Sequence, residues 1–341
     1  MISLERLETV LDRFADQRIG LIGDLFLDRY LEVDPALTEV SIETSLEAHQ
    51  VTAVRNCPGA LGTVINNLQA LGVQSLLPVT VIGNDGHGYD LLHTLKEMGV
   101  DTRYILQDEE RLTPTYTKPM TTDEDGLPRE LNRLDVRTRA GLSSNSRWRL
   151  FQSIRQTWDM VDGWIVLDQI PEDGQGVIDA QTRDFLAEMA SSDLKKLMFV
   201  DSRINIDKFR QGILKTNDVE CLQAVGAQPT EDLNIIQLAA KHRAAEKGLH
   251  VFCTLGPRGI LVASPDGEPT LMQGYPAPEP IDIVGAGDSA TSGIVASLLA
   301  GASFPEASDI GNLVASITVQ QIGTTGTATP SQVLFRWRQT H

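Results

Sequence analysis

Short apolar runs alternate with longer amphipathic stretches along most of the chain. Six runs are short, apolar or β-branched, and bounded by turn residues, and we predict them to be strands: 19–22, 75–81, 163–167, 197–200, 212–216 and 251–255. The stretches between them have helical spacing of apolar residues, as at 61–71, 89–98, 180–190 and 231–247. Alternation of this kind predicts βαβ units and therefore an α/β fold with a buried parallel sheet.

Two regions follow a different pattern. Residues from about 31 to 56 and from about 111 to 136 alternate polar and apolar positions, as in Thr115–Lys118. Such alternation is typical of antiparallel strands with one face in water, so we expect a small second sheet that covers an active site. The segment Thr121–Arg129 is predicted to be a polar turn. Because no repeat or convincing linker divides the sequence, we expect a single domain over residues 1–341.

The charge of the chain restricts its partners. Lys and Arg number 29 against 46 Asp and Glu, which gives a formal net charge of −17 at pH 7. A surface this acidic repels nucleic acid and anionic membranes, so we expect neither as a partner. It also repels phosphorylated ligands, so a nucleotide site needs backbone N–H groups, a bound cation or a few basic side chains to attract them.

Targeting and metal motifs are not recognised in the sequence. The start, Met1–Asp12, is predicted to be an amphipathic helix rather than a signal peptide, because acidic residues stand where basic ones are expected. No apolar run approaches the roughly 18 residues of a membrane helix, and we expect a cytoplasmic protein. Cys57, Cys221 and Cys253 have no CxxC spacing and the histidines form no HExxH pattern, so neither a disulfide framework nor a transition-metal site is predicted.

The most informative segment runs from Asp282 to Gly293 and reads DIVGAGDSATSG. A loop of small residues leads here into an apolar stretch, which predicts a buried helix. Glycines at 285 and 287 let a ligand approach the backbone, and successive N–H groups at a helix start attract an anion. An aspartate at this place repels phosphate, but it is well placed to accept the proton of an attacking hydroxyl.

Asp288 therefore has two interpretations, a catalytic base or a cap after a glycine-rich turn. The segment is not a Walker A loop and not a GxGxxG turn after a strand. It resembles the signature of the ribokinase-like (PfkB-type) sugar kinases. The resemblance implies that Asp288 is the base and that the backbone of Gly285, Ala286 and Gly287 completes the anion hole. It also implies a three-layer α/β/α fold with a mainly parallel central sheet and a small β-sheet lid, and the use of ATP and Mg²⁺.

The resemblance covers nearly the whole chain. Gly23–Tyr30 reads GDLFLDRY, which is most similar to the D-glycero-β-D-manno-heptose-7-phosphate kinase branch of the family. It implies that Asp24, and with it Asp28, binds the sugar. Such a position at the carboxyl end of a strand is where open α/β sheets hold ligands.

The next two blocks depart from the pattern of the heptose kinases. Gly59 matches the first glycine of the sugar loop, but Ala60 replaces the second glycine and Thr63 replaces a sugar-binding Asn. Thr63 has one hydroxyl where Asn offers two donors and an acceptor. Asp168 is implied to bind substrate after its strand, yet the Lys of the heptose kinases is missing from 168–176. These departures change the substrate contacts rather than the fold.

The second half carries the implied nucleotide contacts. Arg203 stands where the family has the basic residue of Asp-Pro-Lys, and is a candidate phosphate ligand. Asn217 and Glu220 match an N-x-x-E motif, which implies that Glu220 organises Mg²⁺ through water. The same spacing also fits a helix N-cap with its capping-box glutamate.

Further matches are implied to lie beside the nucleotide. Thr254, Gly256 and Gly259 match a T-x-G-x-x-G turn, and Asn312 stands near the expected place of the adenine. By family analogy alone, Asp282 is implied to lie beside an activating K⁺.

We therefore expect an ATP-dependent carbohydrate kinase that phosphorylates a hydroxyl of a sugar or sugar phosphate, with heptose 7-phosphate as one candidate. The alternatives are a kinase for another sugar or a nucleoside, and a catalytically retired protein that binds nucleotide or sugar. The resemblance also implies a homodimer that forms through the lid.

Overall fold

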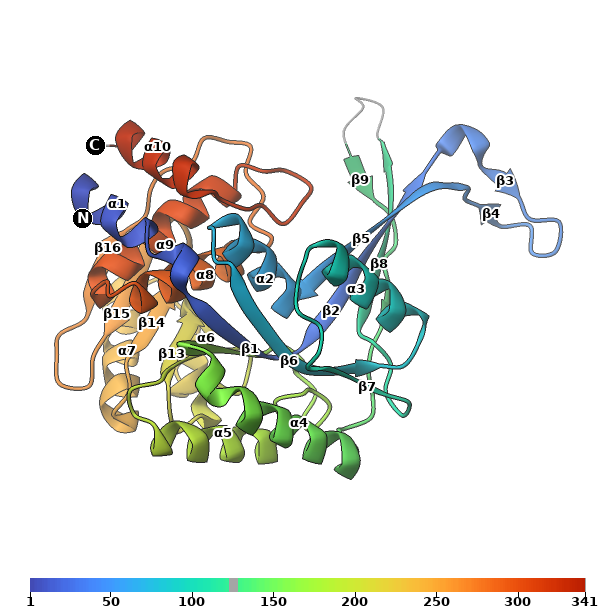
Figure 1. Ribbon diagram of the computed structural model, residues 1–341. Helices are drawn as coiled ribbons and strands as arrows, with labels where there is room; N and C mark the ends of the chain where they lie inside the picture. The colour runs from blue at the N-terminus through green and yellow to red at the C-terminus, as the bar shows by residue number, and fades with distance from the viewer. Residues whose placement is uncertain (123–127, 341) are drawn as a thin grey trace.

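The computed structural model describes residues 1–122 and 128–340. The main sheet has nine strands in the order β16–β15–β14–β13–β12–β11–β1–β6–β7 (Figure 1). In that order their bounds are Thr270–Gln273, Gly259–Ala263, Val251–Thr254, Ile213–Asn217, Leu197–Ser202, Gly163–Asp168, Arg18–Gly23, Ser75–Gly83 and Ile105–Asp108. Neighbours from β14 to β7 are parallel, whereas the β14·β15 and β15·β16 pairs are antiparallel. The six predicted strands all lie in this sheet, and the mainly parallel arrangement is confirmed.

Helices cover both faces of the main sheet and give three layers. One face packs against α1 (Leu4–Leu11), α2 (Leu61–Ala70), α3 (Gly86–Glu97), α8 (Ala286–Leu299), α9 (Phe304–Thr318) and α10 (Pro330–Thr340). The other packs against α4 (Ser144–Thr157), α5 (Ala180–Ser192), α6 (Asp218–Ala224) and α7 (Leu233–Lys247). Short 3-10 helices span Phe14–Asp16, Pro35–Leu37, Trp158–Met160, Ile206–Lys208 and Gly256–Arg258.

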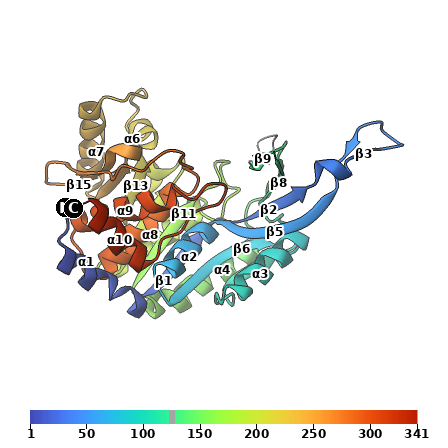
Figure 2. The ribbon, with the colours of Figure 1, turned by 90° about the horizontal axis from the view of Figure 1, so that it is seen from above.

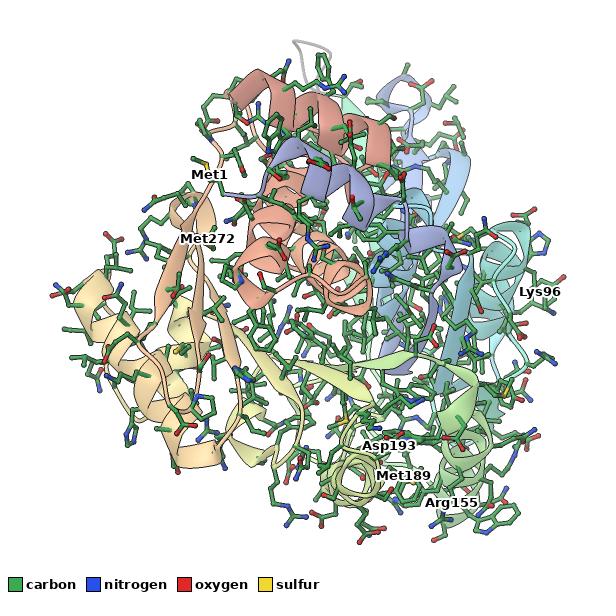
Figure 3. All side chains as sticks on the ribbon, turned by 60° about the vertical axis from the view of Figure 1, so that its left-hand side comes forward. Met1, Lys96, Arg155, Met189, Asp193 and Met272 are labelled. Atoms are coloured by element: carbon green, nitrogen blue, oxygen red, sulfur yellow. The ribbon has the colours of Figure 1, made fainter. Side chains whose placement is uncertain are left out.

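The strand sequences explain why both faces are buried. In β11, Ile165 and Leu167 lie in the core of the first face, and Trp164 and Val166 lie in the core of the second. A run that is apolar on both sides is typical of a parallel strand between two helix layers. Figure 3 shows side chains on both sides of the sheet, with the labelled Met189 in the α5 layer. Among the described residues, no helix combines the length and apolar character needed to cross a bilayer.

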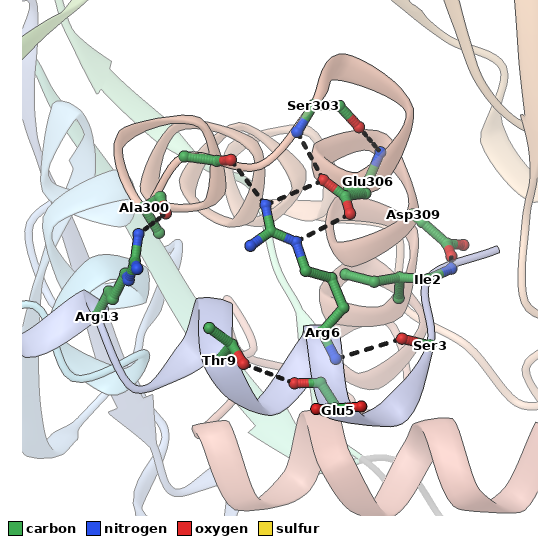
Figure 4. A network of polar contacts seen from close by, with 11 residues as sticks. Ile2, Ser3, Glu5, Arg6, Thr9, Arg13, Ala300, Ser303, Glu306 and Asp309 are labelled. Atoms are coloured by element: carbon green, nitrogen blue, oxygen red, sulfur yellow. Dashed lines mark hydrogen bonds and ion pairs between the residues drawn. The ribbon is translucent and has the colours of Figure 1, made fainter.

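The N-terminal helix α1 is fixed to α9 by polar contacts (Figure 4). The Nε of Arg6 lies 3.0 Å from Oε1 of Glu306, and the N–H of Ile2 donates to Asp309 over 2.6 Å. Arg13 donates to the carbonyl of Ala300. These contacts place the start of the chain beside the helix that follows α8.

A second, five-stranded sheet, the small sheet, projects from the main body (Figure 2). Its order is β10 (Leu134–Val136), β8 (Thr115–Thr122), β2 (Leu25–Val33) and β5 (Val51–Ala60), and β9 (Pro128–Glu130) pairs with β8. A two-stranded hairpin of β3 (Glu39–Val40) and β4 (Glu47–Ala48) lies between β2 and β5 in the chain. The long β2 and β5 strands therefore carry the hairpin away from the main sheet.

The small sheet differs in two ways from the prediction. It begins at Leu25 rather than near residue 31, and β5 continues to Ala60. The β2·β5 pair is antiparallel as predicted, but β2 and β8 are parallel, so the prediction of antiparallel strands is wrong for this pair. The reason is that the chain enters β8 from β7 of the main sheet rather than through a hairpin. The predicted turn at 121–129 lies largely outside the described residues.

Candidate active site

The loop that leads into α8 presents free backbone donors. Gly285 precedes the helix with φ of 80°, in the left-handed region that favours glycine. The N–H of Ala286 donates to the carbonyl of Ile283 over 3.2 Å. In the part of the chain that the structure describes, the N–H groups of Gly287 and Asp288 have no hydrogen-bond acceptor. At the start of a 14-residue helix, these two donors form a site for an anion.

The carboxylate of Asp288 lies beside these donors, and it accepts no hydrogen bond from any described residue. Burial raises the pKa of Asp288 to about 7, and the charge of Asp201 raises it further. The cations of Lys215 and Arg203 oppose this increase. A carboxylate with a pKa near neutrality and no protein partner is suited to accept a proton from a ligand.

An ion pair missed by the sequence analysis lies close to Asp288. Lys215 of β13 and Asp201 of β12 are partners in the strand register, and Nζ lies 2.8 Å from Oδ2 of Asp201. Both side chains are buried. The sequence signal was a lysine inside the apolar run at 212–216, because a lysine is rarely buried without a partner.

Asp24 lies against the loop after β11, and its binding of the sugar stays a prediction. Its Oδ2 accepts the N–H groups of Gln169 and Ile170 over 2.9 and 3.0 Å, and its Oδ1 accepts that of Val177 over 2.8 Å. Only 1% of the residue is exposed. The side chain therefore holds the loop after β11 in place.

Asp28 is the second carboxylate of GDLFLDRY. Its Oδ1 lies 3.4 Å from Nζ of Lys118, and a Cβ added to Gly59 would approach its Oδ2 to 2.8 Å. A side chain at position 59 would thus displace the carboxylate of Asp28. The negative charge of Asp28 raises the pKa of Asp288.

Two further residues predicted to bind substrate are buried by protein contacts. Oδ2 of Asp168 accepts hydrogen bonds from Ser202 over 2.8 Å and from Asn205 over 3.1 Å, and burial raises its pKa to about 6. Thr63 is buried in α2, and its methyl group lies 3.6 Å from the place of a Cβ on Gly285. In this structure Asp168 supports the loop at 202–205, and Thr63 packs beneath the start of α8.

Asn217 and Glu220 form the capping box that was the alternative interpretation of their spacing. Oδ1 of Asn217 accepts the N–H of Glu220 over 2.8 Å, and Oε2 of Glu220 accepts the N–H of Asn217 over 2.7 Å. Nδ2 of Asn217 and Oε1 of Glu220 have no partner among the described residues. The cap therefore leaves one donor and one carboxylate oxygen for a ligand.

The turn after β14 has positive φ angles at its two glycines. Gly256 and Gly259 have φ of 58° and 104°. A Cβ on Gly259 would lie 2.1 Å from the carbonyl oxygen of Met272, so β15 and β16 pack closely only with glycine there. The hydroxyl of Thr254 donates to the carbonyl of Thr216 over 3.2 Å. This turn lies at the carboxyl end of the parallel strands, where α/β sheets hold ligands.

Asn312 and Asp282 each connect two segments. Nδ2 of Asn312, a buried residue of α9, donates to the carbonyls of Met272 and Gln273, and its contact with adenine stays a prediction. The carboxylate of Asp282 accepts the N–H groups of Val284 and Gly323, each over 3.0 Å. Asp282 thus fixes the loop before α8 to the loop before α10.

A cleft opens between the small sheet and the loops after β11 and β12. It is lined by Phe26, Pro114, Tyr116, Val136, Arg137, Thr138, Gln169, Ile170, Pro171, Glu172 and Arg203. Arg203 is exposed and forms no ion pair with the described residues. Arg137 is neutralised by Glu172, with 2.8 Å between the charged atoms. Arg203 is the cation of this cleft that is free to meet an anionic ligand.

The fold is similar to the folds of solved kinase structures. It matches the structure of Arabidopsis thaliana ribokinase complexed with ribose and ATP, with a TM-score of 0.67, 19% identity, and coverage of 94% of this chain and 98% of that one. It also matches phosphofructokinase-2 from Escherichia coli in complex with potassium, with a TM-score of 0.72, 18% identity, and coverage of 95% and 99%. The chain therefore has a ribokinase-like fold.

Sequence comparisons find similarity to carbohydrate kinases. Residues 175–332 match the family model described as pfkB family carbohydrate kinase. The bifunctional proteins HldE of Desulfatibacillum aliphaticivorans and Trichlorobacter lovleyi are 27% and 28% identical over 313 and 331 residues, which are 91% and 96% of this chain. The chain spans 61% and 64% of the length of these relatives. Residues 175–332 are therefore similar to pfkB family carbohydrate kinases, and the similarity to the HldE proteins extends over nearly the whole chain.

Proposed function

We propose that this protein transfers the γ-phosphoryl group of ATP to a hydroxyl of a sugar or sugar phosphate, with Asp288 as the base. The observation that carries the proposal is the unpaired Asp288 carboxylate, with a pKa of about 7, beside the free N–H groups at the start of α8. A base of this pKa is half ionised near neutral pH, which suits proton transfer from an alcohol.

The chemistry follows from the positions of these groups. The substrate oxygen attacks the γ-phosphorus and the bond to the β-phosphate oxygen breaks, while the hydroxyl proton passes to Asp288. The N–H groups of Gly287 and Asp288 stabilise negative charge on the transferring oxygens. We propose that Asp28, which pairs with Lys118, accepts a hydrogen bond from another hydroxyl of the sugar.

Asn217 and Glu220 fit a magnesium ion that is held mainly by ATP and water. Glu220 has one carboxylate oxygen left after capping α6, and Mg²⁺ usually keeps several waters and uses few protein carboxylates. No group of three or more His, Cys, Asp or Glu side chains within residues 1–122 and 128–340 is arranged to hold a metal without a ligand. When bound, Mg²⁺ would neutralise charge on the phosphates.

The glycine turn from Thr254 to Gly259 and the cation of Arg203 are the proposed contacts of the nucleotide. The turn lies at the carboxyl edge of the sheet beside Asn217. A K⁺ ion near Asp282 is also proposed, because the loop that this residue fixes precedes the anion site. The consumption of ATP assigns the reaction to the cytoplasm.

The resemblance of Gly23–Tyr30 to the heptose kinases makes heptose 7-phosphate the first candidate for the acceptor. An unphosphorylated sugar or a nucleoside is the second candidate for the acceptor. It is favoured because Arg137 is neutralised by Glu172 and because the loop at 168–176 has no lysine. The small sheet, which forms one wall of the cleft, is the proposed lid that excludes water from the reaction.

The test is ADP release from ATP and Mg²⁺ across matched pairs of sugars and sugar phosphates, together with nucleosides. We expect one acceptor to be turned over and Asp288→Asn to reduce kcat by about 10²–10⁴-fold, because the base is lost. Asp266→Asn, in an exposed turn, is the matched control and should keep wild-type turnover. Replacement of potassium by sodium in the same assay tests the K⁺ site.

Equal turnover by the wild type and Asp288→Asn would show that Asp288 is not the base. Binding of ATP without turnover of any acceptor would favour the alternative of a retired binding protein.

A further inference from the structure

We propose that Lys215 and Asp201 are positioning residues for the catalytic base, because their buried ion pair sets the charge beneath the first turn of α8. The proposal rests on the proposed function, in which Asp288 is the base. Lys215 and Asp201 lie opposite each other on β13 and β12, and Nζ and Oδ2 are 2.8 Å apart. Their exposed fractions are 6% and 4%.

The pair is in contact with α8. The Nζ of Lys215 lies 3.2 Å from the place that a Cβ on Gly287 would take. One helical turn later, the hydroxyl of Thr291 lies 3.4 Å from Oδ2 of Asp201. The absence of a side chain at position 287 therefore lets a cation approach the backbone that carries the free N–H groups.

Fold stability alone is a weak reason for such a pair. Removing two charges from water costs about as much as their attraction returns, and buried pairs can often be replaced by apolar residues without loss of stability. The neighbours of Lys215 in β13, Leu214 and Thr216, are buried as well. A buried lysine at this place is better explained by the anion site above it.

The two members of the pair act on Asp288 in opposite directions. The charged groups that face Asp288 are Asp201 of β12, Lys215 of β13, Arg203 after β12 and Asp28 of β2. The two carboxylates raise the pKa of Asp288, and the two cations lower it. Glu220 of α6 acts on Lys215 and keeps this lysine charged. Loss of one member therefore leaves the charge of the other uncompensated.

The experiment is a titration of the Asp288 carboxyl carbon by NMR in the free enzyme, with Asp288→Asn used to assign the resonance. This readout needs neither ATP nor an identified acceptor. In Asp201→Asn the remaining lysine should lower the pKa of Asp288, and in Lys215→Met the remaining aspartate should raise it. Each shift should reach about 1 unit, as is usual for a charge within a few ångströms.

Two further variants control for changes in folding. Lys241→Met removes a surface lysine that pairs with Glu268, and should leave the titration of Asp288 unchanged. The double variant Asp201→Asn/Lys215→Met removes both charges and should return the pKa toward that of the wild type. Shifts of the same sign in both single variants, or no shift in either, would overturn the proposal.

The pH dependence of kcat/KM for the acceptor found in the panel gives a second readout. Its acidic limb should move to lower pH in Asp201→Asn and to higher pH in Lys215→Met, since kcat/KM reports the free enzyme. An active enzyme whose acidic limb does not move would refute the role of the pair while the kinase assignment stands. Opposite NMR shifts in an enzyme for which Asp288→Asn stays active would instead refute the assignment of the base.

Discussion

Ala60 has a backbone conformation that is unusual for a residue with a side chain. Its φ is 51° and its ψ is −111°, immediately before the first turn of α2. Residues other than glycine are disfavoured at positive φ because their Cβ crowds the backbone. The residue follows Gly59, where a side chain would displace the carboxylate of Asp28. Strain is thus concentrated where β5 leads into α2.

Relief of this strain should stabilise the protein. Ala60→Gly is expected to increase the free energy of unfolding by about 1 kcal/mol, because the strain that is removed exceeds the added entropy of the unfolded chain. Ala70→Gly, at the helical end of α2, should decrease it by about 1 kcal/mol. Urea denaturation measures both changes, and a loss of stability in Ala60→Gly would show that the alanine is unstrained.

The aspartates show how far single residues could be assigned from the sequence. GDLFLDRY marked both Asp24 and Asp28, but only the structure shows that Asp24 contacts the loop after β11 and that Asp28 pairs with Lys118 of β8. The difference depends on where β1 ends and β2 begins, and element ends are poorly specified by sequence patterns. DIVGAGDS was more informative, since glycines and an aspartate at a helix start constrain backbone and charge together.

At the scale of elements, the loop from Gln169 to Val177 is held from two sides. Asp24 accepts three of its N–H groups, and Arg111 donates to the carbonyl of Gln175 over 2.9 Å and to that of Ala140 over 2.8 Å. Arg111 belongs to the segment that connects β7 to β8. One wall of the cleft is thereby joined to the base of the small sheet.

Removal of this anchor should loosen the wall. Asp24→Ala leaves three buried N–H groups without an acceptor, and should decrease the free energy of unfolding by about 3 kcal/mol. Amides of the loop should exchange with deuterium faster, and KM for the acceptor should rise more than kcat falls. Asp232→Ala removes the exposed N-cap of α7 and should cost about 1 kcal/mol without any effect on the loop. Unchanged exchange in Asp24→Ala would contradict the anchoring role.

The elements of the main sheet were predictable because their signal is local. Each strand is a short apolar run between turn residues, and the parallel order follows from the helices between the strands. The parallel pairing of β2 with β8 could not be predicted in this way, because it depends on a connection through β6, α3 and β7. Alternating polarity indicates one wet face and carries no information about strand direction.

At the scale of the whole molecule, apolar side chains lie exposed on the projecting arm. Val40, Ile42 and Leu46, around the β3–β4 hairpin, have exposed fractions of 68%, 100% and 68%. The hairpin extends away from the main body in Figure 2. Such side chains on an element with few neighbours are typical of an interaction surface, and we propose that they pair with the small sheet of a second copy.

Sedimentation equilibrium tests this homodimer. We expect the wild-type protein to be a dimer and Ile42→Asp to be a monomer, since a charge at the centre of an apolar contact is strongly unfavourable. Leu194→Asp, at an exposed position after α5, should leave the dimer intact. A wild-type monomer at concentrations well above those of the kinetic assays would contradict the proposal.

The pairing of β2 with β8 also determines the order in which the molecule can be completed during synthesis. Asp28 pairs with Cys57 on one side and with Tyr116 on the other. The β2–β5 hairpin can form as soon as residue 60 has emerged, but its other edge has no partner until β8 is made. At about 5–20 residues per second, that edge stays open for several seconds on every ribosome. Translation speed between β5 and β8 therefore sets how long each nascent chain presents an unpaired strand to its neighbours.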